Sequence, residues 1–299
     1  MIELKGIIAP IVTPMNEDES INPDELRRQV DRQIDAGIHG IFPFGTNGEG
    51  YILNGGEKRL VLETVVDQMA GRVPVYAGTG CISTKETIEQ CKAAEAAGAD
   101  ILSVITPSFA KASQHELIVH YTTVAEAVPN MPIVLYNIPA RTGNALEPET
   151  VVELAEVDNI VGAKDSSGNW DNLSAYIDLT KDMDFAVLSG NDALILKALR
   201  RGARGAIAGC ANVYPKNMVG IYESWAKGDD EAAEACQAAV APLRDCFKYG
   251  NPNTVVKTAV NLLGYHVGPC RAPFNYLPEE GLEALRATLD SDRKRGVSL

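Results

Sequence analysis

One lysine in this sequence lies at a position where burying its ammonium group would destabilise the fold, which suggests a chemical role. Lys164 follows the apolar segment 159–163 (NIVGA) and precedes the small and polar residues 165–168 (DSSG). Helical patterns over 147–157 and 169–182 flank it, which predicts that Lys164 lies near the C-terminal end of a short strand. Burial disfavours the ammonium form of a lysine, and the neutral amine attacks carbonyl carbon. The alternative is a strand-end lysine whose ammonium group reaches back to solvent, and this segment alone does not decide between the two.

A tyrosine, a glycine-rich loop and an arginine also lie after predicted strands. Tyr136 ends an apolar segment one strand before Lys164, where it is either a core tyrosine or a functional one. The loop 45–50 (GTNGEG) offers backbone N–H groups and the hydroxyl of Thr46, which suit a small carboxylate or phosphate. Such loops are also common at turns, and this one is not a P-loop because no lysine follows its last glycine. Arg141 is either a surface loop arginine or a bidentate partner for a substrate carboxylate.

Strand-like and helical segments alternate eight times between residues 6 and 227. The strand-like segments are mainly apolar rather than alternating, which is typical of parallel strands buried on both faces. Eight such units predict an α/β protein with a (β/α)8 TIM barrel. A doubly wound open sheet is the alternative, but the first strand ends in Thr13-Pro14 without the glycine fingerprint of that fold. Strands are predicted at 6–14, 41–44, 73–77, 101–105, 132–136, 159–164, 185–188 and 205–208.

Capping residues mark the starts of several helices between these strands. The last part of the chain holds about three further helices, predicted at 230–248, 253–263 and 279–290. We therefore divide the chain into a barrel, residues 1–228, and a C-terminal helical extension, residues 229–299. The extension either packs outside the barrel or forms part of an oligomer interface. The caps are Asn22 before Pro23, Asn54 with Glu57, Ser83 with Glu86, and Ser113 with Glu116.

The composition excludes several classes of protein. Of the 299 residues, 45% are hydrophobic and 22% are charged, as in ordinary globular proteins. A net charge of −13 argues against nucleic acid and anionic membranes as partners, and no apolar segment approaches the ~20 residues of a membrane span. The six cysteines and four histidines are dispersed without CxxC or HExxH patterns, so no metal site is expected. The segment 1–6 is not a signal peptide, and we expect a reduced, cytoplasmic protein.

The chemistry of TIM barrels lies at the C-terminal ends of the strands, and here these ends carry a distinctive set of side chains. The set contains one lysine, one tyrosine and several threonines, without a histidine, a cysteine pair or a carboxylate cluster. It fits Schiff-base chemistry better than metal-based or carboxylate acid–base chemistry. The residues are Thr13, Thr46, Thr79, Phe109, Tyr136, Lys164, Gly190 and Ile207.

Several motifs, in order and with matching spacing, resemble those of the dihydrodipicolinate synthase / N-acetylneuraminate lyase family. The resemblance extends from Gly6 into the C-terminal helices, so it covers essentially the whole chain. The motifs are 45–49 (GTNGE), 77–80 (AGTG), 136–143 (YNIPARTG), 162–165 (GAKD), 188–190 (LSG) and 211–212 (AN).

This resemblance implies an enzyme, a pyruvate-dependent aldolase or lyase that needs no cofactor beyond its own covalent imine. Lys164 would form that imine with the keto carbon of pyruvate, and Tyr136 would relay protons to and from the reacting centre. Thr46 would hydrogen-bond Tyr136. The loop at Thr46 and Asn47 would hold the pyruvate carboxylate. The further positions implied for substrate binding are Gly190, Arg141 and the backbone of Ile207.

The residues leave two kinds of reaction open, which differ in the second substrate. Arg141 favours aspartate semialdehyde, because the matching arginine of the synthase holds that carboxylate, so the leading interpretation is 4-hydroxy-tetrahydrodipicolinate synthase activity. The alternative is a 2-keto-3-deoxy sugar-acid aldolase or an N-acetylneuraminate lyase-like enzyme. It is favoured by Asp165-Ser166-Ser167 and by Phe109, which replaces a tyrosine that reaches over from a neighbouring subunit of the synthase. The missing tyrosine also leaves open a non-catalytic keto-acid binder or regulator.

The resemblance also bears on assembly and regulation. Relatives are commonly tetramers built from dimers, which implies a homo-oligomer, either a dimer or a tetramer. At the positions of the lysine-binding pocket of feedback-inhibited synthases, this chain keeps Glu86 but has Gly50, Tyr51, Gly55 and Ile82. We therefore expect that millimolar lysine does not inhibit.

Overall fold

The computed structural model describes residues 3–298, which form two compact units. Of the described residues, unit 1 consists of 3–5 and Pro74–Ile207. Unit 2 consists of Gly6–Val73 and 208–298. The predicted division between residues 228 and 229 follows the count of strand–helix units instead, and it stays a prediction.

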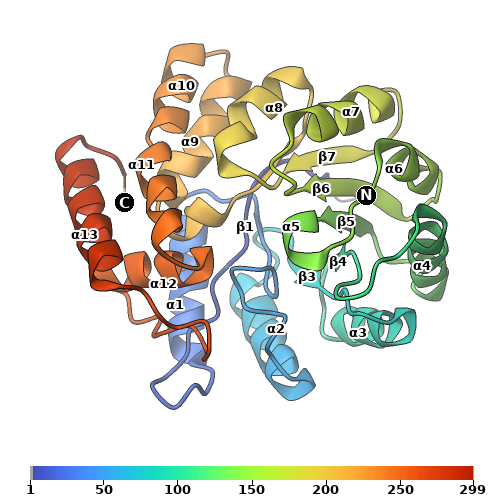
Figure 1. Cartoon of the computed structure of the whole chain (residues 1–299), viewed down its shortest axis with the longest axis horizontal. Coiled ribbons are helices and arrows are strands. Elements are labelled where there is room, and N and C mark those ends of the chain that lie inside the picture. Colours follow the sequence, from blue (N-terminus) through green and yellow to red (C-terminus); the bar gives the residue numbers. More distant parts are fainter. Residues whose placement is uncertain (1–2, 299) are drawn as a thin grey trace. The chain divides into compact units, whose positions relative to one another are not determined.

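Unit 1 is built on parallel strands that pair in chain order from β3 to β8 (Figure 1). Every residue of β5 is buried, as expected of a strand covered on both faces. Gly162 allows β6 to approach β7, because a Cβ atom there would lie 2.5 Å from the carbonyl oxygen of Ala186. The strands are β3 (Tyr76–Gly78), β4 (Ile101–Ile105), β5 (Ile133–Asn137), β6 (Ile160–Asp165), β7 (Ala186–Ser189) and β8 (Gly205–Ile207).

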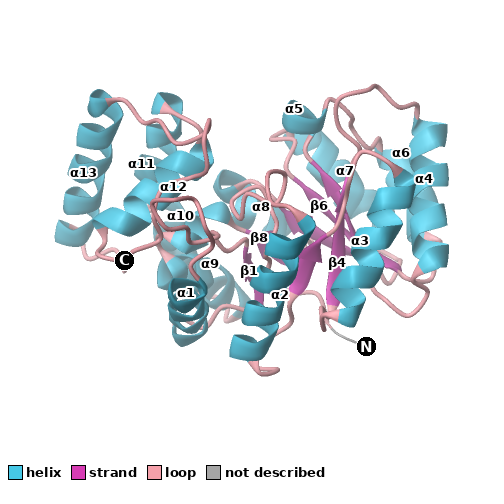
Figure 2. Cartoon of the chain, turned by 90° about the horizontal axis from the view of Figure 1, so that it is seen from below, coloured by secondary structure: helices cyan, strands magenta, loops and turns pink. Residues whose placement is uncertain are grey.

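Helices join the strands of unit 1 and cover the sheet (Figure 2). α3 packs against α4, and α6 packs against α7. Ser113 and Glu116 form the predicted capping box, while the side chain of Ser83 accepts the N–H of Glu86. The helices are α3 (Thr84–Ala96), α4 (Gln114–Ala127), α5 (Pro139–Thr142), α6 (Pro148–Ala155), α7 (Trp170–Thr180), the 3-10 helix η1 (Asp192–Leu194) and α8 (Ile195–Arg201).

Unit 2 begins with two short parallel strands. Both are shorter than predicted, because Pro10 follows β1 directly and Pro43 lies two residues after β2, and a proline has no N–H to donate to a ladder. Asn54 and Glu57 form the predicted capping box of α2. The elements are β1 (Gly6–Ala9), α1 (Pro23–Asp35), β2 (Gly40–Ile41), α2 (Gly55–Met69), the 3-10 helix η2 (Gly209–Asn212) and α9 (Pro215–Ala226).

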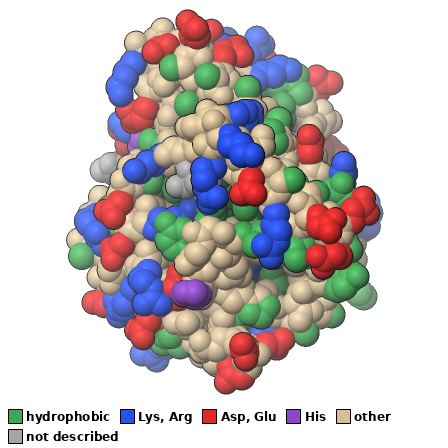
Figure 3. Space-filling model, turned by 90° about the vertical axis from the view of Figure 1, so that its left-hand side faces the viewer, with side chains coloured by type: hydrophobic (Ala, Val, Ile, Leu, Met, Phe, Trp, Pro, Cys, Tyr) green, Lys and Arg blue, Asp and Glu red, His purple; other side chains and the backbone are tan. Residues whose placement is uncertain are grey.

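The C-terminal part of unit 2 is helical, with more pieces than predicted. The single helix expected over 230–248 is divided, because Pro242 cannot donate an intrahelical hydrogen bond. α13 packs against α11 and α12. On the face drawn in Figure 3, acidic and basic side chains are interspersed. The elements are α10 (Asp230–Ala238), α11 (Ala241–Asp245), the 3-10 helix η3 (Cys246–Tyr249), α12 (Pro252–Leu262) and α13 (Glu279–Lys294).

Within residues 3–298, eight strands alternate with helices, which is the predicted (β/α)8 succession, and further helices follow it. Over the same residues, no helix is both long enough and apolar enough to cross a membrane.

Candidate active site

Strand β6 places Lys164 directly beside Tyr136 of β5. The two residues are partners in the parallel register, so their side chains lie next to each other on the same face of the sheet. The Nζ atom of Lys164 lies 3.9 Å from the centre of the Tyr136 ring. Both residues are buried, with exposed fractions of 4% and 3%. The alternative in which Lys164 extends into solvent is therefore wrong.

Gly190, which follows β7, gives the Lys164 side chain its room. A Cβ atom at Gly190 would lie 1.9 Å from Oγ of Ser166 and 2.9 Å from Cε of Lys164. The N–H of Gly190 donates to the carbonyl oxygen of Asp165 at 2.7 Å, which joins the ends of β6 and β7. Glycine is thus the residue that fits between the lysine and its neighbouring strand.

Ile207 is the last residue of β8 and is buried. β8 pairs with β7 through Leu188 and Ser189, one of which precedes Gly190 directly. Unit 1 therefore brings together three of the predicted site residues, Lys164, Tyr136 and Gly190, and holds Ile207 on the strand that pairs with β7.

The carboxylate of Asp165 lies within hydrogen-bonding distance of several donors. Asn137 Nδ2 donates to it at 2.8 Å and Ser167 Oγ at 2.7 Å, and Asn172 Nδ2 lies at 3.3 Å. Burial raises the pKa of Asp165, and these hydrogen bonds oppose that shift. Successive strand residues point to opposite faces, so Asp165 points away from Lys164. The hydrogen bonds of the Asp165 carboxylate connect β6 to β5 and to the start of α7.

This network extends what the sequence indicated. From the sequence, the segment 165–167 indicates only the class of substrate, whereas in the structure Asp165 also holds Asn137 of β5. A carboxylate directly after an apolar strand was the available signal, but its donors come from two other elements.

Arg141 lies on the short helix α5 and is exposed. A hydrogen bond holds α5 to the residue that follows β4, because the hydroxyl groups of Thr142 and Thr106 are 2.8 Å apart. Asn144 then holds the segment after β4, donating from Nδ2 to the carbonyl oxygens of Pro107 and Ala110 at 2.8 and 2.7 Å. The helix that carries Arg141 and the residues after it are thus hydrogen-bonded to the segment that follows β4.

Phe109 lies in the segment that Asn144 holds. Its side chain is 98% exposed, and its φ of +78° lies in the left-handed region, which is strained for a bulky residue. The aromatic ring is therefore presented to solvent on a fixed loop.

Thr46 and Asn47 lie in unit 2, in the loop after β2. The carbonyl oxygen of Thr46 accepts from Asn253 Nδ2 at 2.5 Å and from the N–H of Glu49 at 3.1 Å. The side chain of Asn47 lies beside Gly209, where a Cβ atom would be 3.3 Å from its Oδ1. The two predicted loop residues thus share one tightly bonded turn.

The site residues of unit 1 supply an amine, a phenol and small neighbours. These groups suit attack by an amine on a carbonyl carbon, with a phenol able to move protons. No group of three or more His, Cys, Asp or Glu side chains that could hold a metal ion occurs among residues 3–298.

The chain is similar to known proteins along nearly its whole length. The model of the Dihydrodipicolinate synthetase family matches residues 3–292. A relative from Methanopyrus kandleri named 4-hydroxy-tetrahydrodipicolinate synthase is 43% identical over 290 residues, covering 96% of each chain.

Solved structures show the same likeness. A dihydrodipicolinate synthase (dapA) is 37% identical with a TM-score of 0.91, over 96% of this chain and 99% of that one. The chloride-inhibited synthase of Acinetobacter baumannii, in complex with pyruvate, is 35% identical with a TM-score of 0.93, over 99% and 100% of the two chains. The predicted TIM-barrel fold is thereby confirmed.

Proposed function

Because the chain belongs to the dihydrodipicolinate synthetase family, we propose that it condenses pyruvate with aspartate semialdehyde through an imine on Lys164. This is 4-hydroxy-tetrahydrodipicolinate synthase activity, the activity in the name of its relative from Methanopyrus kandleri. The observation that carries the proposal is the buried amine of Lys164 against the ring of Tyr136 at the ends of two neighbouring strands.

The chemistry begins at the amine. Neutral Lys164 Nζ attacks the keto carbon of pyruvate, the C=N bond forms, and the carbonyl oxygen leaves as water. The imine withdraws electrons, so a proton is lost from the methyl carbon and an enamine forms. The enamine carbon then bonds to the aldehyde carbon of the second substrate, whose oxygen takes up a proton. Tyr136 is the residue we assign to these proton transfers, because its side chain contacts Lys164.

The other site residues bind and orient the substrates. The turn at Thr46 and Asn47 offers backbone N–H groups for the pyruvate carboxylate, and Thr46 supplies a hydroxyl for Tyr136. Gly190 and the Ile207 backbone leave room for the small keto acid beside Lys164. No separate cofactor takes part in this scheme.

Arg141 is the residue we assign to the carboxylate of aspartate semialdehyde. It is exposed on α5, and a guanidinium group matches a carboxylate with two parallel hydrogen bonds. Losing a hydrogen bond to a charged group costs about 1.5–3 kcal/mol, so Arg141→Ala is expected to raise KM for the aldehyde about 10- to 100-fold. Arg286→Ala, an exposed arginine of α13, is the matched control and should leave KM unchanged.

Steady-state assays with pyruvate and a panel of aldehydes test the proposal. We expect turnover with aspartate semialdehyde and much slower cleavage of 2-keto-3-deoxy sugar acids or N-acetylneuraminate. The names of the relatives favour this outcome over the sugar-acid alternative and over a non-catalytic binder. Cleavage of sugar acids without turnover of aspartate semialdehyde would reverse the assignment.

The same proposal includes a cytoplasmic homo-oligomer, a dimer or a tetramer. The ring of Phe109 is almost fully exposed on a loop that Asn144 fixes, and we assign it to the contact with a second copy because the tyrosine that it replaces in the synthase reaches a neighbouring subunit. Sedimentation should show an oligomer that Phe109→Ser weakens, whereas Leu179→Ser, which changes another exposed apolar residue, should not. A monomeric wild-type protein would contradict this part of the proposal.

A further inference from the structure

Helix α12 contacts the turn that carries Thr46 and Asn47. Asn253, in the first turn of α12, is fully buried, and its Nδ2 donates to the carbonyl oxygen of Thr46 at 2.5 Å. The same nitrogen lies 3.3 Å from the hydroxyl of Tyr51. The amide thus reaches the turn from a helix that follows it by about 200 residues in the sequence.

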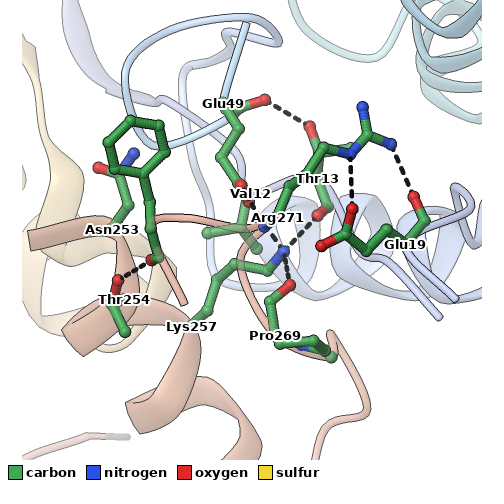
Figure 4. Close-up of polar contacts among 12 residues, drawn as sticks. Val12, Thr13, Glu19, Glu49, Asn253, Thr254, Lys257, Pro269 and Arg271 are labelled. Carbon is green, nitrogen blue, oxygen red and sulfur yellow. Dashed lines mark hydrogen bonds and ion pairs between the residues drawn. The ribbon is translucent and has the colours of Figure 1, made fainter. Parts of the chain in front are cut away.

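One helical turn further on, Lys257 holds the end of the same loop (Figure 4). Its Nζ donates to Glu49 Oε1 at 2.9 Å, to the carbonyl oxygen of Thr13 at 2.8 Å and to that of Pro269 at 2.6 Å. The other carboxylate oxygen of Glu49 accepts the N–H of Arg271 at 2.9 Å. Lys257 and Glu49 are both buried, so each needs the other to compensate its charge.

The loop that these contacts hold is conformationally strained. Phe44 and Glu49 have φ angles of +65° and +55°, which are unfavourable for residues with side chains. A Cβ atom at Gly50 would lie 2.2 Å from the carbonyl oxygen of Phe44, so the two ends of the loop approach closely. Such a turn keeps its shape only where surrounding contacts fix it.

The geometry of the peptide bond connects these contacts to the substrate. The carbonyl of Thr46 and the N–H of Asn47 belong to one planar, trans peptide unit and therefore point in opposite directions. Fixing the carbonyl through Asn253 fixes the direction of the Asn47 N–H, which is a donor of the turn assigned to the pyruvate carboxylate.

We propose that Asn253 and Lys257 are positioning residues for pyruvate binding. Helix α12 then has two roles: it packs in unit 2, and it orients the turn that binds the pyruvate carboxylate. This inference rests on the proposed function. Asn253 orients the peptide between Thr46 and Asn47, and Lys257 anchors the loop through Glu49. Neither residue touches the reacting atoms.

The test measures how pyruvate concentration controls imine formation in Asn253→Ala. Borohydride trapping of the imine, followed by protein mass, gives the half-saturating pyruvate concentration and the maximum extent of trapping. Because one positioning hydrogen bond is lost, the half-saturating concentration is expected to rise about tenfold, with little change in the maximum.

Asn261→Ala is the matched control. Asn261 is an exposed asparagine of the same helix whose amide bonds both backbone groups of Gly268 at 2.9 and 3.2 Å, without contact to the turn. It should lower the melting temperature without changing the half-saturating concentration. If Asn253→Ala does not fold, Asn253→Ser keeps a small polar group at the position but is too short to reach Thr46, and it gives the same measurement.

The outcomes separate this inference from the proposed function. Equal half-saturating concentrations in the Asn253 and Asn261 variants overturn the positioning role while the proposed function stands. A wild-type protein that shows no pyruvate-dependent trapping overturns both.

Discussion

Two lysines of this chain are buried to almost the same degree, and their surroundings differ in kind. Lys164 of β6, in unit 1, is 4% exposed, and its amine lies over the ring of Tyr136. Lys257 of α12, in unit 2, is 1% exposed, and its amine donates to three oxygen atoms at 2.6–2.9 Å.

The difference teaches that burial alone does not identify a nucleophilic lysine. Three acceptors, one of them the carboxylate of Glu49, match the three N–H bonds of an ammonium group, so every donor of Lys257 Nζ has a partner. Lys164 lies one residue before the end of β6, beside Gly190 and the phenol ring of Tyr136. The first environment suits a structural cation, and the second contains the amine that we propose as the reacting one.

The largest effect should come from removing Lys164, the nucleophile that we propose. Lys164→Ala eliminates the covalent route, so kcat should fall at least about 10⁴-fold, while the melting temperature changes little. Coupled turnover assays and thermal melting measure the two quantities. A variant that retains a tenth of wild-type activity would mean that another residue forms the intermediate.

Removing the other lysine should act on stability first. Lys257→Met leaves the carboxylate of Glu49 buried and uncompensated, which costs about 3–5 kcal/mol of unfolding free energy. Denaturant unfolding measures the loss. The double variant Lys257→Met with Glu49→Gln should recover part of it, because no buried charge remains unpaired. Equal stability of the wild-type protein and the single variant would show that the Lys257–Glu49 pair does not stabilise the fold.

A methyl group beside Lys164 should separate activity from stability. Gly190→Ala puts a Cβ atom 1.9 Å from Oγ of Ser166 and 2.9 Å from Cε of Lys164, so the side chains around the Lys164 amine must rearrange. Misplacement of a reacting group by about 1 Å costs roughly 10²-fold in rate. Gly55→Ala, where a Cβ atom meets no neighbour within 4 Å, is the control and should keep full activity. If the two variants have the same kcat/KM, Gly190 does not shape the site.

The smallest effect concerns the pH dependence of stability through Asp165. Burial raises its pKa in the folded protein, so the native state binds a proton more tightly than the unfolded chain does. The unfolding free energy should therefore fall as pH rises from the unfolded-state pKa, about 3.9, through the native value, and Asp165→Asn should remove this decrease. Unfolding followed between acidic and neutral pH checks the slope. An unchanged slope in the variant would assign it to another group.

Much of the fold could be predicted because its signals are local. The capping box of Asn54 and Glu57 occurs as the spacing predicts, and eight apolar segments at regular intervals indicate parallel strands. Lys164 and Tyr136 were identifiable because each ends such a segment, and adjacent parallel strands bring those ends together.

The rest of the site depends on contacts between distant residues. Glu49 and Lys257 are separated by 208 positions, and no local sequence pattern near either residue indicates that the other is its partner. A lysine within the apolar run of α12 was the available signal for a buried charge. The partners of Asp165 likewise come from β5 and α7, so its role follows from packing that local patterns do not specify.

Mass spectrometry after borohydride reduction in the presence of pyruvate tests the central comparison most directly. Peptide mapping locates the reduced adduct on the chain. We expect it on the peptide that contains Lys164 and on no peptide that contains Lys257. An adduct on Lys257, or none on Lys164, would contradict the assignment of the reacting amine.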